Sequence, residues 1–365
     1  MQRYFEQLFA HLVTEGSAEF DFELFWSGWR GNRQHIRRLK EIQLADRLRK
    51  RWLPLPQTLV EARGLRALSA YLNTGITHSF GTGSLPRKLD RLVLTLQDII
   101  SLKCAGELVH DKNAVERWIA AQLEDAKSIT TISEFSKLEI SSYFSIDESR
   151  IAVIPNGVDH ERFRPLRQEE LAAADAVLHN LGISVPYILT LGGTIKRKNL
   201  ANLIEAFGIL KRNGKIEHKL VLAGPQQLSE DAQLAVDRNS LHDDIVSPGY
   251  IEDCDVRAVL GRAHVFVFPS LYEGFGLPPL EAMACGVPVA SSNAASLPEV
   301  GGDAVRYFDP SDPSNISEVL YELIGDEQLW ARCRTAGLAR SSLFSWQRAA
   351  QRMLEVYTSL RTIEQ

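Results

Sequence analysis

The chain has 365 residues, which is long enough for two α/β domains that each bury a core. Its apolar content of 45% and charged content of 24% are ordinary for a soluble globular protein, and its net charge of -5 argues against general nucleic-acid binding. The four cysteines lack metal-binding spacing, and no apolar run reaches the length of a membrane span. We therefore expect a cytoplasmic protein with reduced, mostly buried thiols, no metal and no secretion signal.

The N-terminal region combines an amphipathic helix with a strongly basic segment. Residues 2–13 carry apolar side chains at helical spacing, and residues 20–26 alternate like a strand. Residues 28–51 hold nine Lys or Arg against two acids, with tryptophans at the margins. Two interpretations stay open: peripheral contact with anionic lipid headgroups, and a solvated helix face beside core tryptophans.

The remainder of the first half has the pattern of a parallel α/β domain. A buried strand at residues 91–96 ends at two polar residues, Gln97 and Asp98. A helix and two further strands follow at residues 115–126, 128–132 and 151–154. The polar, proline-bearing stretch near residues 160–183 is typical of an interdomain linker.

The second half opens with a buried strand at residues 187–191 and a glycine turn that carries three cations. Gly193 lies in this turn, and Arg197 and Lys198 precede a helix predicted from residue 200 to 211. Cations at the carboxyl end of a parallel strand are well placed to neutralise a leaving diphosphate. In isolation the turn is equally compatible with solvated surface charge.

Two further strands are predicted at residues 219–223 and from residue 245, ending at Gly224 and just before Tyr250. Asp253 and Asp255 form a D-x-D sequence, which binds metal in some transferases. Here it directly precedes a predicted helix, so we interpret it as an acidic helix cap.

The segment at residues 264–310 is the most informative part of the chain. It predicts a strand at 265–269, a glycine loop, a helix at 280–284 with two prolines in its first turn, and a strand at 287–291. Gly274 and Gly276 permit positive φ and close approach of a ligand, and the helix start favours a diphosphate. Glu273 and Glu281 could accept bonds from sugar hydroxyls, although a loop acid and a solvated helix acid are the simpler interpretation.

These residues carry a resemblance to a known family. The sequence EGFGLPPLE at 273–281, with its acids in an E-x7-E frame, resembles the donor-site signature of retaining GT-B glycosyltransferases of family 4, also called group 1. Similar segments occur at 130–136 (TTISEFS), 156–159 (NGVD), 191–200 (LGGTIKRKNL) and 296–304 (SLPEVGGDA). The wording GLPPLEAMACG resembles a bacterial mannosyltransferase-like branch that builds surface polysaccharides. The resemblance extends from about residue 75 to the C-terminus.

The resemblance implies two Rossmann-like domains that face each other across a cleft. Residues 1–160 would bind the acceptor, residues 183–343 would bind the nucleotide-sugar donor, and the helix at 344–365 would return to the N-terminal domain. It implies retaining transfer of a hexose, with mannose favoured, to a hydroxyl of a glycan or lipid-linked glycan. No cofactor is required, and the donor is GDP-mannose or a UDP-sugar.

The resemblance also implies a role for each candidate residue. Catalysis would fall to Glu273, which holds the donor sugar, and to Lys198 and Arg197, which stabilise the leaving diphosphate. Glu281 would bind the ribose. The remaining donor contacts would come from Gly193, Gly224, Tyr250, Gly274, Phe275, Gly276 and Leu277, and the acceptor side of the cleft would include Gln97 and Asp98.

The chain departs from the family pattern at two places. Gln97 stands where relatives have His, and Gln cannot act as an acid or base near neutral pH. The first strand and glycine-rich loop expected of the N-terminal domain are missing. Both departures support one alternative, a non-catalytic nucleotide-sugar-binding partner subunit. The other alternative is a GT-B nucleotide-sugar epimerase, which would need acid/base groups in the cleft, and Gln97 argues against it. Two localisations also stay open: the cytoplasm alone, and the cytoplasmic face of the inner membrane.

Overall fold

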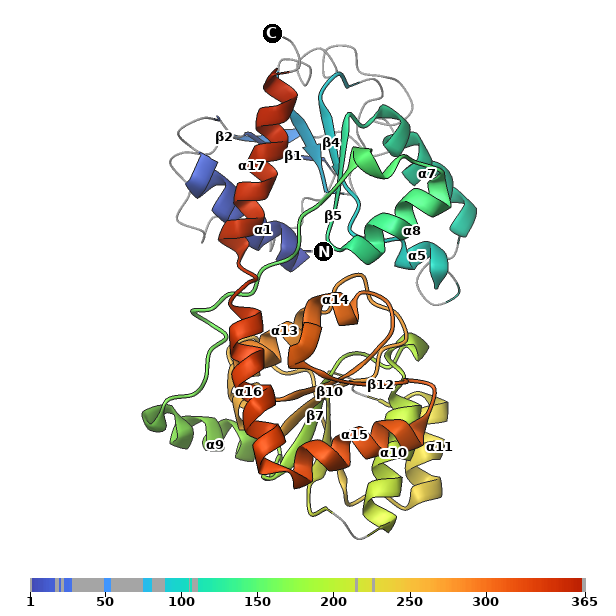
Figure 1. The fold of residues 1–365 in the computed structure, drawn as a ribbon, viewed down its shortest axis with the longest axis vertical. Helices are drawn as coiled ribbons and strands as arrows, with labels where there is room; N and C mark the ends of the chain where they lie inside the picture. Colours follow the sequence, from blue (N-terminus) through green and yellow to red (C-terminus); the bar gives the residue numbers. More distant parts are fainter. Residues whose placement is uncertain are drawn as a thin grey trace. The chain divides into compact units, whose positions relative to one another are not determined.

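A computed structural model describes residues 2–16, 20, 23–27, 49–53, 75–80, 89–104, 106, 111–213, 216–224 and 227–362. The chain divides into two compact units, one of residues 1–157 with 345–365 and one of residues 158–344. Each unit contains its own parallel sheet with helices against it (Figure 1). The predicted α/β class with two Rossmann-like domains is therefore confirmed.

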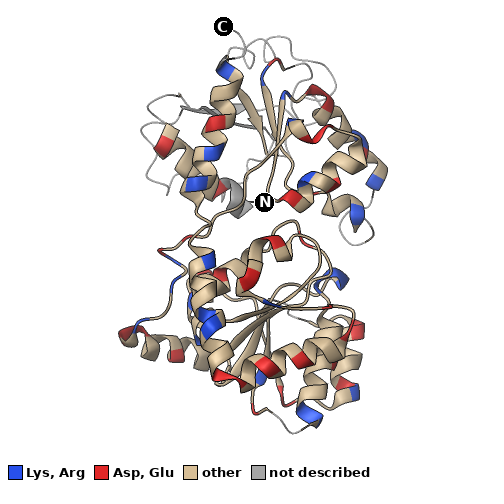
Figure 2. Cartoon of the chain, viewed as in Figure 1, with Lys and Arg blue, Asp and Glu red and all other residues tan. Residues whose placement is uncertain are grey.

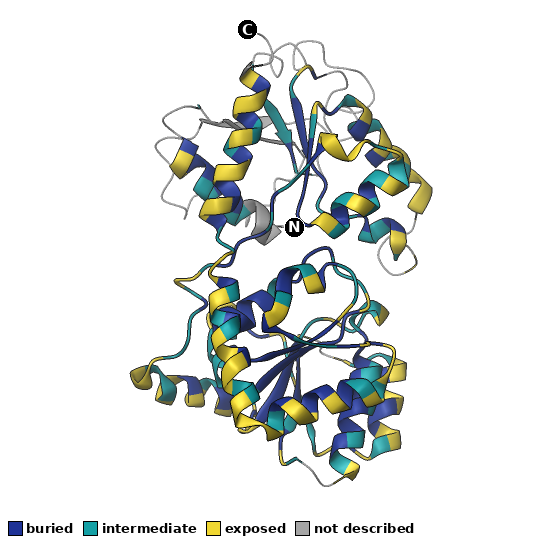
Figure 3. Ribbon diagram, in the orientation of Figure 1, coloured by how far each residue is buried: buried dark blue, intermediate teal, exposed yellow. Residues whose placement is uncertain are grey.

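The unit of residues 158–344 is built on a six-stranded sheet in the order β12-β11-β10-β7-β8-β9. All neighbouring strands in it are parallel. Its central strands are buried along their length (Figure 3), which is why they read as continuous apolar runs such as VFVF in β10. The strands are β7 (Tyr187–Leu191), β8 (Lys219–Ala223), β9 (Ile245–Gly249), β10 (Val265–Phe268), β11 (Val289–Ser292) and β12 (Arg306–Phe308).

Helices cover this sheet and complete its core. α10 packs against α11 and α15 on one side of the sheet, and their apolar faces form one cluster with strand residues such as Leu220 and Val267. α13 contacts β10, β11 and α16. The helical segments are η2 (Gln168–Glu170), α9 (Leu171–Asn180), η3 (Lys196–Lys198), α10 (Leu200–Arg212), α11 (Glu230–Asn239), α12 (Val256–Arg262), α13 (Leu277–Ala284), α14 (Leu297–Gly301), η4 (Gly302–Ala304), α15 (Pro313–Gly325) and α16 (Glu327–Ser341).

The other unit holds a four-stranded parallel sheet in the order β3-β4-β5-β6, and β1 pairs with β2 in a separate two-stranded sheet. Its core gathers side chains of β4, β5, α7 and α8. The strands are β1 (Glu23–Ser27), β2 (Arg49–Leu53), β3 (Thr77–Ser79), β4 (Leu92–Thr95), β5 (Ser128–Thr131) and β6 (Ile151–Val153). The helices are α1 (Gln2–Gly16), α5 (Ile100–Lys103), α7 (Lys112–Asp125), α8 (Glu134–Phe144), η1 (Glu148–Arg150) and α17 (Trp346–Thr362).

The final helix belongs to the same unit as the N-terminus, which confirms the predicted return of the chain. α17 packs against α1. Its Tyr357 hydroxyl lies 2.6 Å from Nδ1 of His78, and Nε2 of His78 lies 2.7 Å from the hydroxyl of Thr95. Burial lowers the pKa of His78 to about 3. His78 is therefore a neutral structural side chain that links α17 to β3 and β4.

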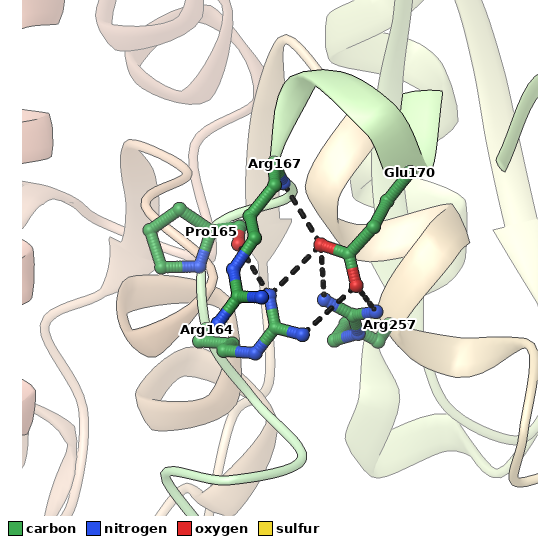
Figure 4. A network of polar contacts seen from close by, with 5 residues as sticks. All are labelled: Arg164, Pro165, Arg167, Glu170 and Arg257. Carbon is green, nitrogen blue, oxygen red and sulfur yellow. Dashed lines mark hydrogen bonds and ion pairs between the residues drawn. The ribbon is translucent and has the colours of Figure 1, made fainter. Parts of the chain in front are cut away.

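An ion-pair network secures the segment that enters the second unit (Figure 4). Both carboxylate oxygens of Glu170 accept bonds from the guanidinium groups of Arg164 and Arg257, at 2.6 to 3.2 Å. The backbone N–H of Arg167 also donates to Glu170. The hydrogen bonds from Arg164 and then Arg257 hold the pKa of Glu170 well below its usual range. The predicted linker is thus fixed to α12 through Arg257.

Cys285 and Cys333 are buried, but Cys254 is exposed, so the prediction of mostly buried thiols is wrong there. Among the residues described, no helix is long and apolar enough to cross a bilayer. Helices such as α7 and α16 carry both signs of charge along their length (Figure 2). The basic segment at residues 28–51 lies almost wholly outside the described residues.

Candidate functional site

The candidate site lies where the order of the six-stranded sheet reverses. β7, the first strand of this sheet in the chain, is flanked by β8 on one side and by β10 on the other. Chains that wind away from a central strand in both directions leave a crevice at the carboxyl ends of the two strands at the switch point. Those two strands are β7 and β10. The predicted cationic turn follows β7 and the predicted glycine loop follows β10, so the fold brings both segments to this point.

Glu273 and the two predicted cations meet there. Oε1 of Glu273 lies 2.6 Å from Nη1 of Arg197 and 2.7 Å from Nζ of Lys198. The three side chains are only 11% to 15% exposed. Two cations therefore share one carboxylate in a mostly buried setting, which leaves an excess of positive charge at this position.

The environment of Lys198 makes its charge costly. Burial lowers its pKa, the nearby Glu273 carboxylate acts in the opposite direction, and the Arg197 cation lowers the pKa further. Its ammonium group lies 4.8 Å from the centroid of the Phe268 ring, a cation–π distance that offsets part of the lost hydration. An anion arriving beside Lys198 would stabilise the protonated form.

Asn199 ties the cationic turn to the neighbouring loops. Its backbone is left-handed, with φ of 59°, a conformation that Asn adopts more easily than most residues. Its side-chain amide donates to the carbonyl of Pro269 at 3.1 Å and to that of Pro310 at 2.7 Å. In addition, the N–H of Leu271 donates to the carbonyl of Arg197. The cations are thus held by backbone bonds and do not depend on the ion pairs alone.

The glycine loop leads directly into α13, whose first turn contains Pro278 and Pro279. Gly276 has φ of 110°, and a Cβ there would approach Leu297 Cδ2 to 2.7 Å, so only glycine fits. Of the two glycines expected to permit a positive φ, Gly276 adopts one and Gly274 does not. Among the described residues, no hydrogen bond uses the N–H groups of Phe275, Gly276 or Leu277.

Ser296 binds the backbone of this loop through its hydroxyl, a role that the sequence did not reveal. Its hydroxyl, which is fully buried, lies 2.9 Å from the carbonyl oxygen of Glu273 and 3.1 Å from that of Phe275. The motif at 296–304 marked the segment, but nothing in the sequence linked Ser296 to residues more than twenty positions earlier.

Glu281 lies one turn into α13 and is 6% exposed. It is therefore not the solvated helix acid of the simpler interpretation. It acts on the nearby thiol of Cys285, whose pKa is raised to about 12 by burial first and by the Glu281 carboxylate second. The sequence therefore places a buried carboxylate on the helix that directly follows the glycine loop.

The remaining candidates of this unit lie at the same edge of the sheet, after neighbouring strands. Gly193 faces open space, so its environment does not by itself demand glycine. Gly224 has φ of 117°, and a Cβ there would collide with the carbonyl of Gly192, which is a structural requirement for glycine. Tyr250 directly follows β9 and is 64% exposed, a placement compatible with stacking on a ligand ring.

Gln97 and Asp98 belong to the other unit and follow β4. The carbonyl of Gln97 accepts a bond from the Thr131 hydroxyl at 2.9 Å, and Oδ1 of Asp98 accepts one from the N–H of Ile100 at 3.0 Å. These contacts define the local backbone. Neither of these two hydrogen bonds involves the side-chain amide of Gln97.

The D-x-D sequence is structural, but not in the way expected. Asp255 occupies the N-cap position of α12, yet its side chain makes no capping bond. Asp253 instead forms an ion pair with Arg162 at 3.4 Å. Within the described part of the chain, no group of three or more His, Cys, Asp or Glu side chains could hold a metal ion.

Known proteins match the chain across both units. Residues 180–340 match the family "Glycosyl transferases group 1", and residues 1–162 match "Glycosyltransferase Family 4". The O-antigen chain mannosyltransferase B of Escherichia coli is 35% identical over 283 residues, which cover 76% of this chain and 72% of that protein. The serotype-specific mannosyltransferase WbdA of Escherichia coli is 32% identical over 74% of this chain, but this chain covers only 34% of that longer protein.

A solved structure agrees with the fold. The glycosyltransferase from Rickettsia africae superposes with a TM-score of 0.76 at 16% identity, covering 99% of this chain and 95% of that one. At this identity the match concerns the fold, which is that of the GT-B glycosyltransferases. Together with the sequence matches, it shows that the chain belongs to the group 1 glycosyltransferase family.

Proposed function

We propose that the protein is a retaining glycosyltransferase that moves a hexose, with mannose favoured, from a nucleoside diphosphate sugar to a hydroxyl of a glycan or lipid-linked glycan. The observation that carries this proposal is the sharing of Glu273 by Arg197 and Lys198 beside the first turn of α13. The names of the two Escherichia coli relatives support mannose as the sugar and surface polysaccharide synthesis as the process. The same names favour GDP-mannose over a UDP-sugar as the donor.

In this proposal the donor diphosphate binds between the cations and the start of α13. Lys198 and Arg197 stabilise the negative charge that builds on the β-phosphate as its bond to the anomeric carbon breaks. The N–H groups of Gly276 and Leu277 add donors at the positive end of the helix dipole. Glu281 accepts bonds from the ribose hydroxyls, and Tyr250 packs on the base.

The acceptor hydroxyl forms the new bond to the anomeric carbon on the face that the diphosphate leaves, and its proton passes to the departing phosphate oxygen. This route needs no protein nucleophile, because positioning and charge stabilisation supply the catalysis. Glu273 orients the donor sugar through its hydroxyls. We assign Gln97 and Asp98 to the acceptor side, where Gln97 offers hydrogen bonds but no proton transfer.

The test is a donor panel with an added acceptor. The full chain is incubated with GDP-mannose, UDP-glucose or UDP-N-acetylglucosamine and a mannose-containing oligosaccharide, and the product anomer is read by NMR. We expect an α-linked product from one donor and a loss of at least a hundredfold in rate for Lys198→Met, since a charge at the leaving group is removed. Arg306→Met, which removes an exposed cation paired with Glu322, is the matched control.

The panel also separates the alternatives. A β-linked product would overturn the retaining assignment. Nucleotide sugar that changes configuration while still attached to its nucleotide would identify an epimerase. Binding of a nucleotide without any transfer to acceptor would favour a non-catalytic partner subunit, and both of these results would reject the proposed reaction.

A further inference from the structure

Ser296 makes an unusual pair of contacts with the glycine loop. Its single hydroxyl lies within hydrogen-bond distance of two backbone carbonyl oxygens, those of Glu273 at 2.9 Å and Phe275 at 3.1 Å. The side chain is fully buried, so water does not compete for these acceptors. A hydroxyl carries one proton, and two carbonyl oxygens thus converge on one donor.

These bonds fix the orientation of two peptide groups. In a trans peptide the C=O and N–H point in opposite directions, because the unit is planar. Holding the carbonyls of Glu273 and Phe275 toward Ser296 therefore turns the N–H groups of Gly274 and Gly276 away from it. The N–H of Gly276, the N-cap residue of α13, therefore points away from the Ser296 hydroxyl.

The loop needs such a restraint. Gly274 and Gly276 carry no side chains that could anchor the backbone, and glycine has the largest range of accessible conformations. The peptide between Phe275 and Gly276 could rotate at modest cost if the Ser296 bond were absent. Rotation would point a carbonyl, rather than an N–H, at an arriving phosphate.

Ser296 is itself held on a firm support. It precedes α14, whose terminal carbonyls at Glu299 and Val300 accept bonds from the guanidinium of Arg340 at 2.6 and 2.9 Å. The hydroxyl of Tyr307 donates to the carbonyl of Gly302 at 3.0 Å. The carboxyl-terminal end of the short helix is thus tied to α16 through Arg340 and to β12 through Tyr307, which restrains the segment that carries Ser296.

We propose that Ser296 is a positioning residue that directs the N–H of Gly276 toward the diphosphate of the donor. It does not touch the donor and acts through the orientation of the loop peptides. This inference rests on the proposed function, since it assumes that a diphosphate binds beside α13. It predicts that loss of the hydroxyl weakens recognition of the diphosphate and leaves recognition of the nucleoside intact.

The experiment compares the binding of nucleoside diphosphates and monophosphates to wild type and to Ser296→Ala. Titration calorimetry is carried out on the full chain with UDP and UMP and with GDP and GMP, for wild type and Ser296→Ala. We expect Ser296→Ala to weaken binding of the preferred diphosphate by about tenfold and of its monophosphate by less than about twofold, since a charge-assisted hydrogen bond is misdirected. Ser341→Ala is the matched control, because Ser341 is 1% exposed and its hydroxyl bonds to Leu338 within α16.

The outcomes keep the two proposals apart. If wild type prefers a diphosphate and Ser296→Ala weakens both ligands equally or neither, the positioning role is overturned while the proposed function stands. If wild type binds none of the four nucleotides, the proposed function itself fails. Should Ser296→Ala not fold, Ser296→Cys fills the same space with a weak donor, and the same selective loss of diphosphate binding is expected.

Discussion

Nζ of Lys198 lies 2.7 Å from Oε1 of Glu273, although the two residues are 75 positions apart in the chain. The pair spans the two loops at the switch point of the sheet, and Arg197 bonds to the same carboxylate oxygen. Glu273 therefore acts as the counter-ion of two buried cations. A donor diphosphate would bring negative charge to the same cations. Their neutralisation would then depend less on the Glu273 carboxylate.

This relationship predicts that Glu273→Gln separates nucleotide binding from transfer. Without the carboxylate two cations lose their shared partner, so we expect the free energy of unfolding to fall by about 1–3 kcal/mol. A nucleoside diphosphate should still bind, and at saturating concentration it should recover most of that loss. The rate of sugar transfer should fall by about a hundredfold, since a neutral amide accepts bonds from the sugar hydroxyls more weakly than a carboxylate does.

The measurement is denaturant unfolding with and without nucleotide, together with an initial-rate assay. Glu322→Gln provides the control, because Glu322 pairs with Arg306 at 2.6 Å but is 49% exposed. An exposed pair of this kind contributes about 0–1 kcal/mol. Unchanged stability in Glu273→Gln, or loss of diphosphate binding, would contradict the counter-ion role.

The lowered pKa of Lys198 predicts that activity is lost at alkaline pH. Its pKa is lowered, chiefly by burial, so the protonated form that binds phosphate is lost at a lower pH than for an exposed lysine. We expect kcat/KM for the donor to fall as the pH rises through this pKa. In Lys198→Arg the fall should move to higher pH even if the rate is reduced, because a guanidinium stays charged.

The pH profile of kcat/KM for both proteins from about pH 7 to about pH 10 checks this, since it reports groups of the free enzyme. Identical alkaline limbs in wild type and Lys198→Arg would assign the titration to another group.

Much of the fold was predictable because its signals are local. Apolar runs identified the strands, and serine is a residue type that favours helix starts, as at Ser133, whose hydroxyl accepts the N–H of Ser136 at 3.0 Å at the N-cap of α8. The order of the six strands was not readable, because it depends on crossovers between distant segments. α13 begins at Leu277, so Pro278 and Pro279 lie in its first turn, as predicted from the tolerance of proline at that position.

The residues of the candidate site likewise fall into those that the sequence identified and those that it did not. Glu273, Lys198 and Gly276 carry chemistry or backbone freedom in their own residue types, so the sequence identified them. Ser296 and Asn199 act through bonds to carbonyl groups, which every residue possesses, and no spacing rule reveals such partners. The Asn199 amide, for example, reaches the carbonyl of Pro310, 111 positions away.

We expect Tyr250 to contribute to nucleotide affinity but not to the free energy of unfolding. Its ring is 64% exposed, so Tyr250→Ala should change the free energy of unfolding by less than about 0.5 kcal/mol. Loss of stacking on the base should weaken nucleotide binding by about fivefold. Tyr321→Ala, at a site on α15 that is 44% exposed, should affect neither. Equal nucleotide affinity in wild type and Tyr250→Ala would remove Tyr250 from the site.

A pair of histidines, His218 just before β8 and His264 just before β10, predicts that the protein loses stability in acid. Nε2 of His218 lies 2.5 Å from Nδ1 of His264, which requires that at least one ring stays neutral. Burial first, then His264 and Lys211, lowers the pKa of His218 to about 4. The unfolded chain, with an ordinary pKa, binds this proton more readily. Stability from this group is therefore complete above about pH 6.5 and is lost as the pH falls toward about 4.

Denaturant unfolding at several pH values tests this. We expect wild type to lose about 2–3 kcal/mol more than His218→Gln across that range. His242→Gln is the control, since the side chain of His242 is 63% exposed. The same pH dependence in wild type and His218→Gln would show that carboxylates elsewhere dominate the acid response.

A thermal-shift panel tests most directly whether residues 158–344 bind a nucleoside diphosphate sugar. Wild type and Glu281→Ala are melted with GDP, UDP, ADP, GDP-mannose, UDP-glucose and UDP-N-acetylglucosamine. We predict that one nucleotide and its sugar raise the melting temperature of wild type, because ligands that bind the native state stabilise it, and that Glu281→Ala loses this shift. A wild-type protein that melts cooperatively at the same temperature with every one of these ligands would contradict the binding of a nucleoside diphosphate sugar by these residues.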